Sequence, residues 1–246
     1  MPPANFQSHP APISDYAAAV AKVQAMQAAE SAAPGFNPAL HSLLLTHGQK
    51  TRRAVLWFHG YTAATLQFGP LAELCNSQGC NALVPCMPHH GFQDRLSPEI
   101  SRIKARELVR FADEMIDLMH GLGEEIIVGG LSMGGALAAW AAQQRSDVAL
   151  ALIIAPFLGA RRIPTRQTWA FAHLTQFLPD KRQWWDPEQK ETAPGSGYGY
   201  LQYSSRSLGQ ILQVGGYPCF GGCPPAAACN WKNLAGDQRS RPLREQ

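Results

Sequence analysis

The stretch Val128–Trp140, which reads VGGLSMGGALAAW, joins an apolar run to an alanine-rich segment through a compact Gly-x-Ser-x-Gly motif. The apolar run predicts the end of a buried strand, and the alanines predict a helix that begins directly after Ser132. This pattern is the sequence form of a nucleophile elbow, a sharp strand-to-helix turn that presents a serine hydroxyl. Because a serine hydroxyl alone is a weak nucleophile, the motif also requires a base and an acid elsewhere in the chain.

Short apolar segments without polar alternation recur on both sides of this motif, and segments of helical character separate them. The predicted strands are LHSLLLTHG (40–48), AVLWF (54–58), NALVP (81–85), EEIIV (124–128) and DVALALIIAP (147–156). The predicted helices are 14–32, capped by Ser14 or Asp15, a segment ending near 77, a long helix starting at Ser97-Pro98, and one from 198 that ends at Gly215.

Unalternated strands separated by helices predict a doubly wound, mostly parallel α/β sheet that is covered on both faces. Right-handed crossovers place the carboxyl ends of such strands at one edge of the sheet. We therefore expect Ser132 to meet the loop that contains His59 and Gly60 at that edge.

The 246 residues suffice for one α/β domain with a sizeable core. Hydrophobic residues make up 46% and charged residues 16%, as is typical of a globular chain. The net charge of +3 is small and the basic residues are scattered, which argues against nucleic acid as a partner. No signal-peptide pattern opens residues 1–30 and no apolar run reaches bilayer length, so the expected location is cytoplasmic.

The six cysteines fall into two groups. Those within the predicted fold, Cys75, Cys80 and Cys86, are expected to be reduced and buried. The later group is spaced Cys-x3-Cys-x5-Cys, which fits no common zinc pattern, and consists of Cys219, Cys223 and Cys229. We therefore expect no metal and no cofactor.

Four segments resemble the α/β-hydrolase superfamily, near its monoacylglycerol-lipase, carboxylesterase and serine-aminopeptidase branch. They are LWFHGYTAA (56–64), LVPCMPHHG (83–91), GGLSMGG (129–135) and ALIIAPF (151–157), in the order and approximate spacing of that family. The resemblance covers roughly residues 40 to 215 and implies a sheet of the α/β-hydrolase type with an inserted lid.

The resemblance implies a role for each residue near the motif. Ser132 would be the nucleophile, on a turn with positive φ, and the backbone N–H groups of Tyr61 and Met133 would form the oxyanion hole. Four further residues would shape the site, namely His59, Gly60, Gly130 and Gly134.

Three features have more than one interpretation each. His59 is a proton carrier or, in the favoured interpretation, a structural residue of its loop. His89-His90 is a pair at the edge of the substrate site or a replacement base or, in the favoured interpretation, a hydrogen-bonded loop pair. The lid aromatics line an acyl pocket or form the lid's own core; they are Trp169, Phe171, Phe177, Trp184 and Trp185.

The acid and the base of a triad are not identifiable from the sequence. The family order places both after the nucleophile, yet no carboxylate ends the strand at 148–155. The aspartates considered after it are Asp180, Asp186 and Asp237, and His173 is the only histidine that follows Ser132.

The last segment has an unusual composition. From Gly216 onward there is no Val or Ile, and the only Leu residues are Leu234 and Leu243, so this tail cannot supply the further buried strands that the family has. The abrupt change predicts a reading-frame shift or an early end, and a sheet that lacks its last strands. We also expect poor stability or aggregation, because apolar surface would stay uncovered.

The sequence thus predicts the following organisation: an N-terminal helix and linker (1–36), an α/β-hydrolase core (37–156), a lid (157–196), a core helix (197–215) and a disordered tail (216–246). The leading functional hypothesis is a serine hydrolase that attacks small apolar carboxylic esters, including lipid-like acyl esters, through an acyl-Ser132 intermediate. One rival is a catalytically incomplete hydrolase, and another is an acyltransferase or thioesterase on the same fold. The sequence does not specify an oligomeric state.

Overall fold

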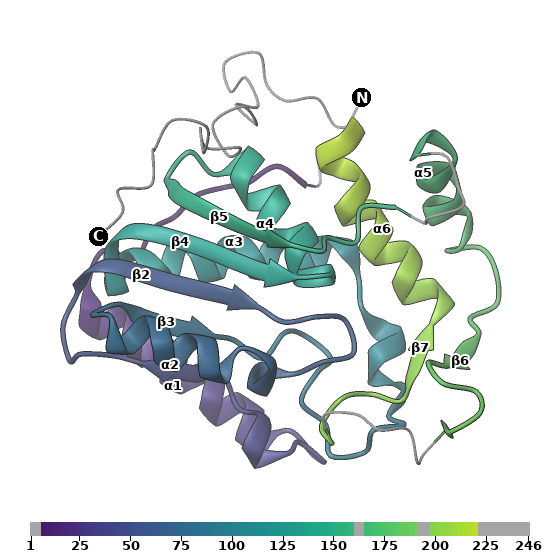
Figure 1. Ribbon diagram of the computed structural model, residues 1–246, viewed down its shortest axis with the longest axis horizontal. Coiled ribbons are helices and arrows are strands. Elements are labelled where there is room, and N and C mark those ends of the chain that lie inside the picture. Colours follow the sequence, from purple (N-terminus) through teal and green to yellow (C-terminus); the bar gives the residue numbers. More distant parts are fainter. Residues whose placement is uncertain (1–5, 160–164, 191–196, 221–246) are drawn as a thin grey trace, which may run out of the picture.

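The computed structural model describes residues 6–159, 165–190 and 197–220. In these ranges one five-stranded sheet forms the centre of the molecule, in the strand order β1-β3-β2-β4-β5 (Figure 1). Its strands are β1 (Leu43–Leu45), β2 (Thr51–Phe58), β3 (Asn81–Val84), β4 (Gly123–Leu131) and β5 (Val148–Ile154). All neighbours pair in parallel except β1, which runs antiparallel to β3. The predicted mostly parallel α/β sheet is therefore confirmed.

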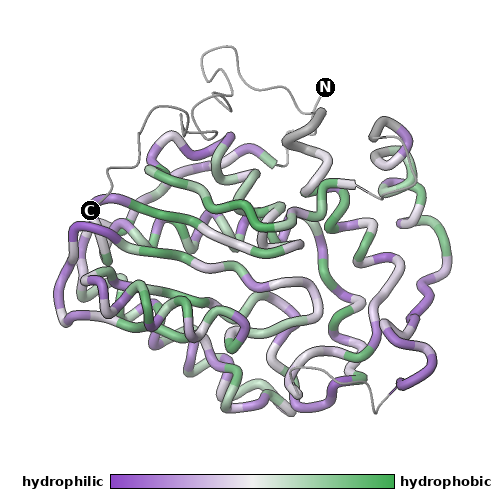
Figure 2. Tube along the Cα trace, viewed as in Figure 1, coloured by the Kyte–Doolittle hydropathy of each residue, from purple (hydrophilic) through white to green (hydrophobic). Residues whose placement is uncertain are grey.

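Helices cover both faces of this sheet, as a doubly wound fold requires. On one face α2 (Gly69–Ser77) packs over a small core that includes Val55, Trp57 and Val84. On the other face α3 (Ala105–Leu122) and α4 (Met133–Gln144) enclose the larger core, with α1 (Tyr16–Ala32) packed on α3. Figure 2 shows apolar residues, in green, along β4 and β5.

The register of β2 against β4 positions the edge where the predicted site lies. Phe58 pairs with Gly130, so β2 and β4 end side by side. The loop after β2 and the turn after β4 consequently meet at the carboxyl edge of the sheet, as the sequence predicted.

The helix predicted to start at Ser97-Pro98 is interrupted. Its cap is present, because the Ser97 hydroxyl accepts a hydrogen bond from the Glu99 N–H, but only the short 3-10 helix η4 (Pro98–Arg102) follows. Ile103 and Lys104 are extended, and α3 begins at Ala105. The break turns Ile103 fully into the core, and the Gln210 side chain accepts the Ala105 N–H from a distant helix.

The last predicted helix also has different bounds. Residues Gln202–Ser204 form β7, which pairs with β6 (Arg182–Trp184) in a small separate sheet, and α6 runs over Ser205–Phe220. Gly215 does not end α6. A Cβ there would lie 2.1 Å from the Phe157 carbonyl oxygen, so this glycine allows α6 to approach the chain after β5 closely. The described chain also contains two shorter 3-10 helices, η2 (Pro38–Leu40) and η3 (Thr65–Gln67), and the helix α5 (Thr165–Leu174), which falls within the predicted lid.

Three further predictions concern the cap of α1, the cysteines within the fold and the C-terminal tail. Asp15 caps α1 by accepting the Ala18 N–H, which decides between it and Ser14. Cys75, Cys80 and Cys86 are free thiols, but only Cys86 is buried, so the expectation of three buried cysteines was wrong for the pair at the end of α2. The predicted tail lies outside the described residues except for 216–220, which continue α6.

The outer edge of β5 is unpaired within the described ranges. Leu150, Leu152 and Ile154 lie on the face that α2 covers elsewhere, and they are 40%, 39% and 40% exposed. None of the described helices is long and apolar enough to cross a bilayer.

Candidate active site

Ser132 occupies a strained turn between β4 and α4. Its backbone has φ 57° and ψ −109°, the positive φ that the sequence predicted, and such a conformation is costly for a residue with a side chain. Two hydrogen bonds of about 3.0 Å hold it there, one from the Ser132 N–H to the Ile154 carbonyl and one from the Phe157 N–H to the Ser132 carbonyl. The last residue of β5 and the segment that follows it thus hold the elbow in place.

Two glycines allow this turn to close. A Cβ on Gly130 would lie 2.2 Å from the Gly134 carbonyl oxygen, and one on Gly134 would lie 2.0 Å from the Phe58 carbonyl oxygen. Both distances fall far inside van der Waals contact, and the second atom belongs to a neighbouring strand. The Gly-x-Ser-x-Gly spacing is therefore required by the approach of α4 to the ends of β2 and β4.

Two backbone N–H groups beside Ser132 indicate a binding site for an anion. Those of Tyr61 and Met133 donate to no acceptor among the described residues, and both residues line the same pocket as Ser132. Met133 is the first residue of α4, so its N–H lies at the positive end of a helix dipole. The Gly60 N–H, in contrast, is taken by the Gln67 side chain at 2.7 Å, which fixes the loop that carries Tyr61.

The pocket that contains Ser132 has a volume of about 330 Å³. Its lining is mostly apolar and consists of Gly60, Tyr61, Thr62, Ala63, Gln67, Leu131, Ser132, Met133, Phe157, Trp185, Leu208 and Ile211. This lining contains no carboxylate and no imidazole. Burial raises the pKa of Tyr61 to about 12, and its hydroxyl accepts the Ser204 N–H, so this phenol is neutral at ordinary pH.

His59 is a buried structural residue. Its Nδ1–H donates to the Gly60 carbonyl at 3.0 Å, and its Nε2 accepts the Met87 N–H at 3.2 Å, so backbone groups occupy both nitrogens. Burial, followed by the neighbouring His90, lowers the pKa of His59 to about 3. A neutral imidazole held in this way is a poor base for Ser132.

His89 and His90 also form loop contacts. His90 is buried, contacts the Tyr61 and Pro88 carbonyls through its two nitrogens, and burial lowers its pKa. His89 has φ 66° and bridges the carboxylates of Glu99 at 3.0 Å and Glu107 at 3.1 Å. These contacts match the interpretation as a hydrogen-bonded loop pair.

Of the acidic and basic residues considered for the triad, Asp180, Asp186 and His173 are described, and none of these three lines the Ser132 pocket. Asp180 holds the start of α6: burial opposes its ionisation, but hydrogen bonds from the Arg206 N–H and the Ser204 hydroxyl lower its pKa overall. Asp186 accepts the N–H groups of Glu188 and Gln189 in a turn. His173 lines a separate cavity with α3 and α6, and Asp237 lies outside the described residues.

The structure does contain a close Asp–His pair, which the sequence did not reveal. His120 Nε2 and Asp147 Oδ2 are 2.7 Å apart, and Arg145 joins Asp147 to the buried Asp113 and Asp117. Asp147 precedes β5, whereas Ser132 bonds to the last residue of that strand. Seven strand residues separate the two, on the order of 20 Å, so this pair cannot act on Ser132.

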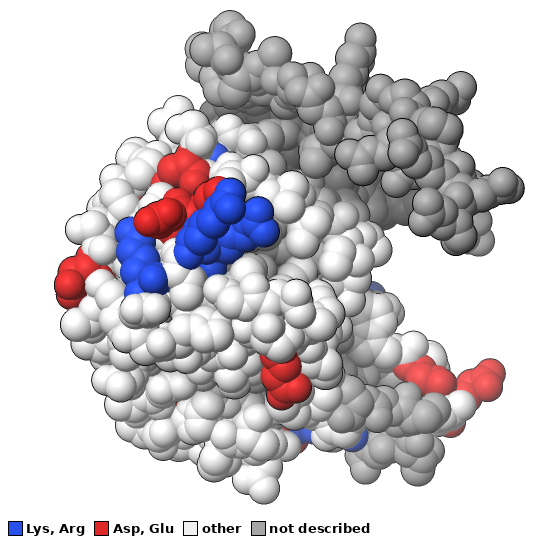
Figure 3. Space-filling model, turned by 60° about the vertical axis from the view of Figure 1, so that its left-hand side comes forward, with Lys and Arg blue, Asp and Glu red and all other residues white. Residues whose placement is uncertain are grey.

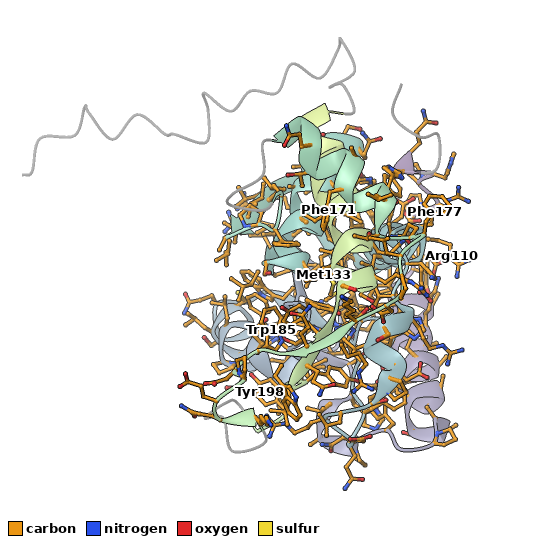
Figure 4. All side chains as sticks on the ribbon, turned by 90° about the vertical axis from the view of Figure 1, so that its right-hand side faces the viewer. Arg110, Met133, Phe171, Phe177, Trp185 and Tyr198 are labelled. Carbon is orange, nitrogen blue, oxygen red and sulfur yellow. The ribbon has the colours of Figure 1, made fainter. Side chains whose placement is uncertain are left out.

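Of the described aromatic side chains in the predicted lid, Trp185 lines the Ser132 pocket together with Met133, and both are labelled in Figure 4. Trp185 lies against Tyr203, with ring centroids 4.5 Å apart. Phe171 and Phe177 are not among the residues that line the pocket and are exposed, Phe177 to 85%. Trp184 is half-buried in β6, and the side chain of Trp169 lies outside the described set. The four side chains that are described do not together line the pocket.

No metal site is evident in the part of the chain that the structure describes, where no three side chains of the His, Cys, Asp or Glu type are grouped to hold an ion. The side chains of Cys219, Cys223 and Cys229 are outside that part.

Solved structures share this fold at low sequence identity. The metagenome-derived lipolytic enzymes LipS and LipT are represented by a chain with a TM-score of 0.55 and 19% identity, aligned over 74% of this chain and 71% of that one. A monoglyceride lipase from Saccharomyces cerevisiae has a TM-score of 0.53 and 15% identity, over 72% and 64%. A monoacylglycerol lipase from Paleococcus ferrophilus has a TM-score of 0.50 and 18% identity, over 73% and 71%. This chain therefore spans less than two thirds of the yeast lipase.

No curated protein sequence matches the chain. Residues 43–236 match the sequence profile of the Alpha/beta hydrolase family, and that range includes the sheet, the elbow and α6. The profile, the strand order and the strained serine between β4 and α4 agree with one another, and the chain belongs to the α/β hydrolase family.

Proposed function

We propose that the chain is a serine hydrolase that attacks small, apolar carboxylic esters through an acyl-Ser132 intermediate. The observation that carries this proposal is the Ser132 elbow, which opens into an apolar pocket beside two backbone N–H groups without acceptors. The fold shared with structures named as lipases and monoglyceride lipases supports the substrate class.

In the proposed reaction the Ser132 oxygen attacks the ester carbonyl carbon. The carbonyl oxygen becomes an oxyanion, which the N–H groups of Tyr61 and Met133 and the start of α4 would stabilise. The alkoxide then leaves and water hydrolyses the acyl-serine. Gly130 and Gly134 keep the turn closed, while His59 and Gly60 hold the facing loop.

The proton of Ser132 has no imidazole acceptor in the pocket as described. It would pass to water or to the leaving alkoxide, so turnover should be slow. Enzymes stripped of their triad keep roughly 10³- to 10⁴-fold acceleration over water from the oxyanion hole and binding alone. We expect activity of that order.

A second candidate, a binding protein without turnover, follows from the same lining. Its oxyanion donors would still bind a carbonyl group, but the serine would not be acylated. An acyltransferase or thioesterase shares the acyl-serine and differs in the group that is attacked or released.

Active-site labelling separates these candidates. The purified chain, Ser132→Ala and the control Ser31→Ala would be treated with a fluorophosphonate probe after circular dichroism shows that each is folded. Ser31 is an exposed residue of α1, far along the chain from the elbow. Labelling of the parent and of Ser31→Ala, but not of Ser132→Ala, supports the hydrolase. Folded parent protein that remains unlabelled supports the binding protein.

Substrate size can be tested on the same samples. The pocket of about 330 Å³ should accept short acyl chains. We expect p-nitrophenyl butyrate to compete with the probe more strongly than p-nitrophenyl palmitate, and faster product release with a thiol or alcohol acceptor would indicate transfer.

A further inference from the structure

A second cavity lies on the other side of α6 from the Ser132 pocket. It has a volume of about 710 Å³ and shares no lining residue with that pocket. Arg206 of α6 lines it, whereas Leu208 of α6 lines the Ser132 pocket. Residues two apart on a helix point about 200° apart, so the two cavities face opposite sides of α6.

The lining of this cavity is strongly basic. Five cationic side chains, Arg102, Lys104, Arg106, Arg110 and Arg206, face one lining carboxylate, that of Glu107. They come from η4, from the start of α3 and from the first turn of α6. On another face, which Figure 3 shows, blue and red groups lie next to each other.

Only some of these cations have carboxylate partners. Arg102 pairs with Glu99 at 2.7 Å and Arg110 with Glu114 at 3.5 Å. Glu107 is engaged by His89, which it meets at 3.1 Å.

Lys104, Arg106 and Arg206 have no ion pair with any residue in the described ranges. The guanidinium of Arg206 donates to the Leu178 carbonyl at 3.2 Å, but its buried Nε finds no acceptor there. Asp180 takes the backbone N–H of Arg206 rather than its side chain. Three cations that make no ion pair among the described residues thus line one cavity, whose one lining carboxylate is that of Glu107.

The backbone adds positive charge at the same place. Lys104 is the N-cap residue of α3, and no side-chain hydrogen bond caps the helix there. The helix α3 is 18 residues long. The Ala105 N–H is taken by Gln210, whereas the N–H groups of Arg106 and Glu107 donate to none of the described acceptors. The positive end of the helix dipole therefore lies among the unpaired cations.

We propose that this cavity binds a multivalent oxyanion, of the kind carried by a phosphate or pyrophosphate group. An anion would relieve the repulsion among Lys104, Arg106 and Arg206 and supply acceptors for the buried Nε and the free N–H groups. The proposal does not depend on the chemistry at Ser132. The same phosphate chemistry occurs in soluble metabolites and in lipid headgroups.

Calorimetric titration of the full chain with pyrophosphate tests the soluble source. We expect saturable binding that weakens as NaCl is raised. The double variant Lys104→Gln/Arg106→Gln should bind about tenfold more weakly or worse, because charge-assisted hydrogen bonds are lost. The control Arg52→Gln/Arg53→Gln removes two cations that share an ion pair with Glu125 at the opposite edge of the sheet, and it should bind within about twofold of the parent.

Sedimentation with phosphatidate-containing phosphatidylcholine vesicles tests the lipid source, with pure phosphatidylcholine vesicles as reference. Binding to the phosphatidate vesicles alone, lost in Lys104→Gln/Arg106→Gln, assigns the cavity to a headgroup. The proposal is overturned if neither pyrophosphate nor these vesicles bind, or if the Lys104→Gln/Arg106→Gln variant binds as well as the parent.

Discussion

The backbone N–H of Ser132 donates to the carbonyl oxygen of Ile154 at 3.0 Å. This bond ties the strained residue of the elbow to the last residue of β5, whose outer edge is unpaired in the described ranges. The geometry of the proposed nucleophile therefore depends on a strand at the border of the sheet. Changes to the packing of the elbow or to β5 should affect both stability and the reactivity of Ser132.

Closing of the elbow can be tested with Gly134→Ala. The new methyl group would lie 2.0 Å from the Phe58 carbonyl oxygen, so α4 or β2 must shift. We expect a loss of about 1–3 kcal/mol in unfolding free energy, measured by urea denaturation, together with loss of fluorophosphonate labelling. Gly69→Ala is the matched control, because a Cβ there meets nothing within 4 Å. Equal stability of the two variants would contradict the steric account.

The edge of β5 should drive self-association. Leu152→Lys places a charge within the exposed apolar row formed with Leu150 and Ile154, and we expect less aggregation by light scattering at unchanged secondary structure. Leu74→Lys, at an exposed leucine of α2, is the control. If Leu74→Lys suppresses aggregation equally, the added positive charge is responsible, and its position on β5 is not. A parent chain that stays monomeric and melts cooperatively at high temperature would refute the expectation of poor stability.

The Arg145 cluster should make stability fall in acid. The hydrogen bond from Arg145 lowers the pKa of Asp147 to about 2, below its unfolded value. A depressed carboxyl pKa contributes stability above the unfolded pKa and loses it as pH falls through the folded pKa, here between about pH 4 and pH 2. We expect urea midpoints to drop over this window, and to drop less in Asp147→Asn. Glu125→Gln, which removes an exposed carboxylate whose pKa Arg53 lowers, should change the profile little.

Removing the buried cation itself should have a larger effect. The Arg145 side chain bonds to Asp113, Asp117 and Asp147, each at 2.7 Å. Arg145→Met would leave the buried carboxylates of Asp113 and Asp117 without their counter-charge, and we expect about 3–5 kcal/mol of destabilisation at neutral pH. Arg110→Met, at a more exposed ion pair of 3.5 Å, should cost less than about 1 kcal/mol. Similar losses of unfolding free energy in both variants would show that the buried Arg145 cluster stabilises the fold no more than an exposed ion pair does.

His59 should make stability depend on pH in a range above the one where Asp147 titrates. Burial lowers its folded pKa to about 3, so between about pH 6.5 and pH 3 the unfolded chain binds a proton that the folded chain excludes. Stability must then rise with pH in this window, by up to about 1.4 kcal/mol per pH unit from this one group. In His59→Gln the slope of urea stability between pH 6 and pH 4.5 should decrease. An unchanged slope would mean that His59 is accessible to protons in the fold.

The sequence by itself determined the features that rest on contacts between near neighbours. The Gly-x-Ser-x-Gly spacing defined the positive-φ turn at Ser132, and the unalternated apolar runs defined the parallel strands, because burial on both faces excludes polar side chains. The lack of a histidine after His173 likewise follows from the residues alone.

Contacts between residues far apart in the chain decided the rest. Gln210 fixes where α3 begins and Asp180 where α6 begins, over separations that no local pattern records. The register of the sheet places Asp147 with His120 at the edge opposite Ser132, and packing brings Trp185 to the pocket. Hydrogen bonds and charges act through space, so only the tertiary structure could show that no described acid or imidazole lines the Ser132 pocket and that unpaired cations gather in another cavity.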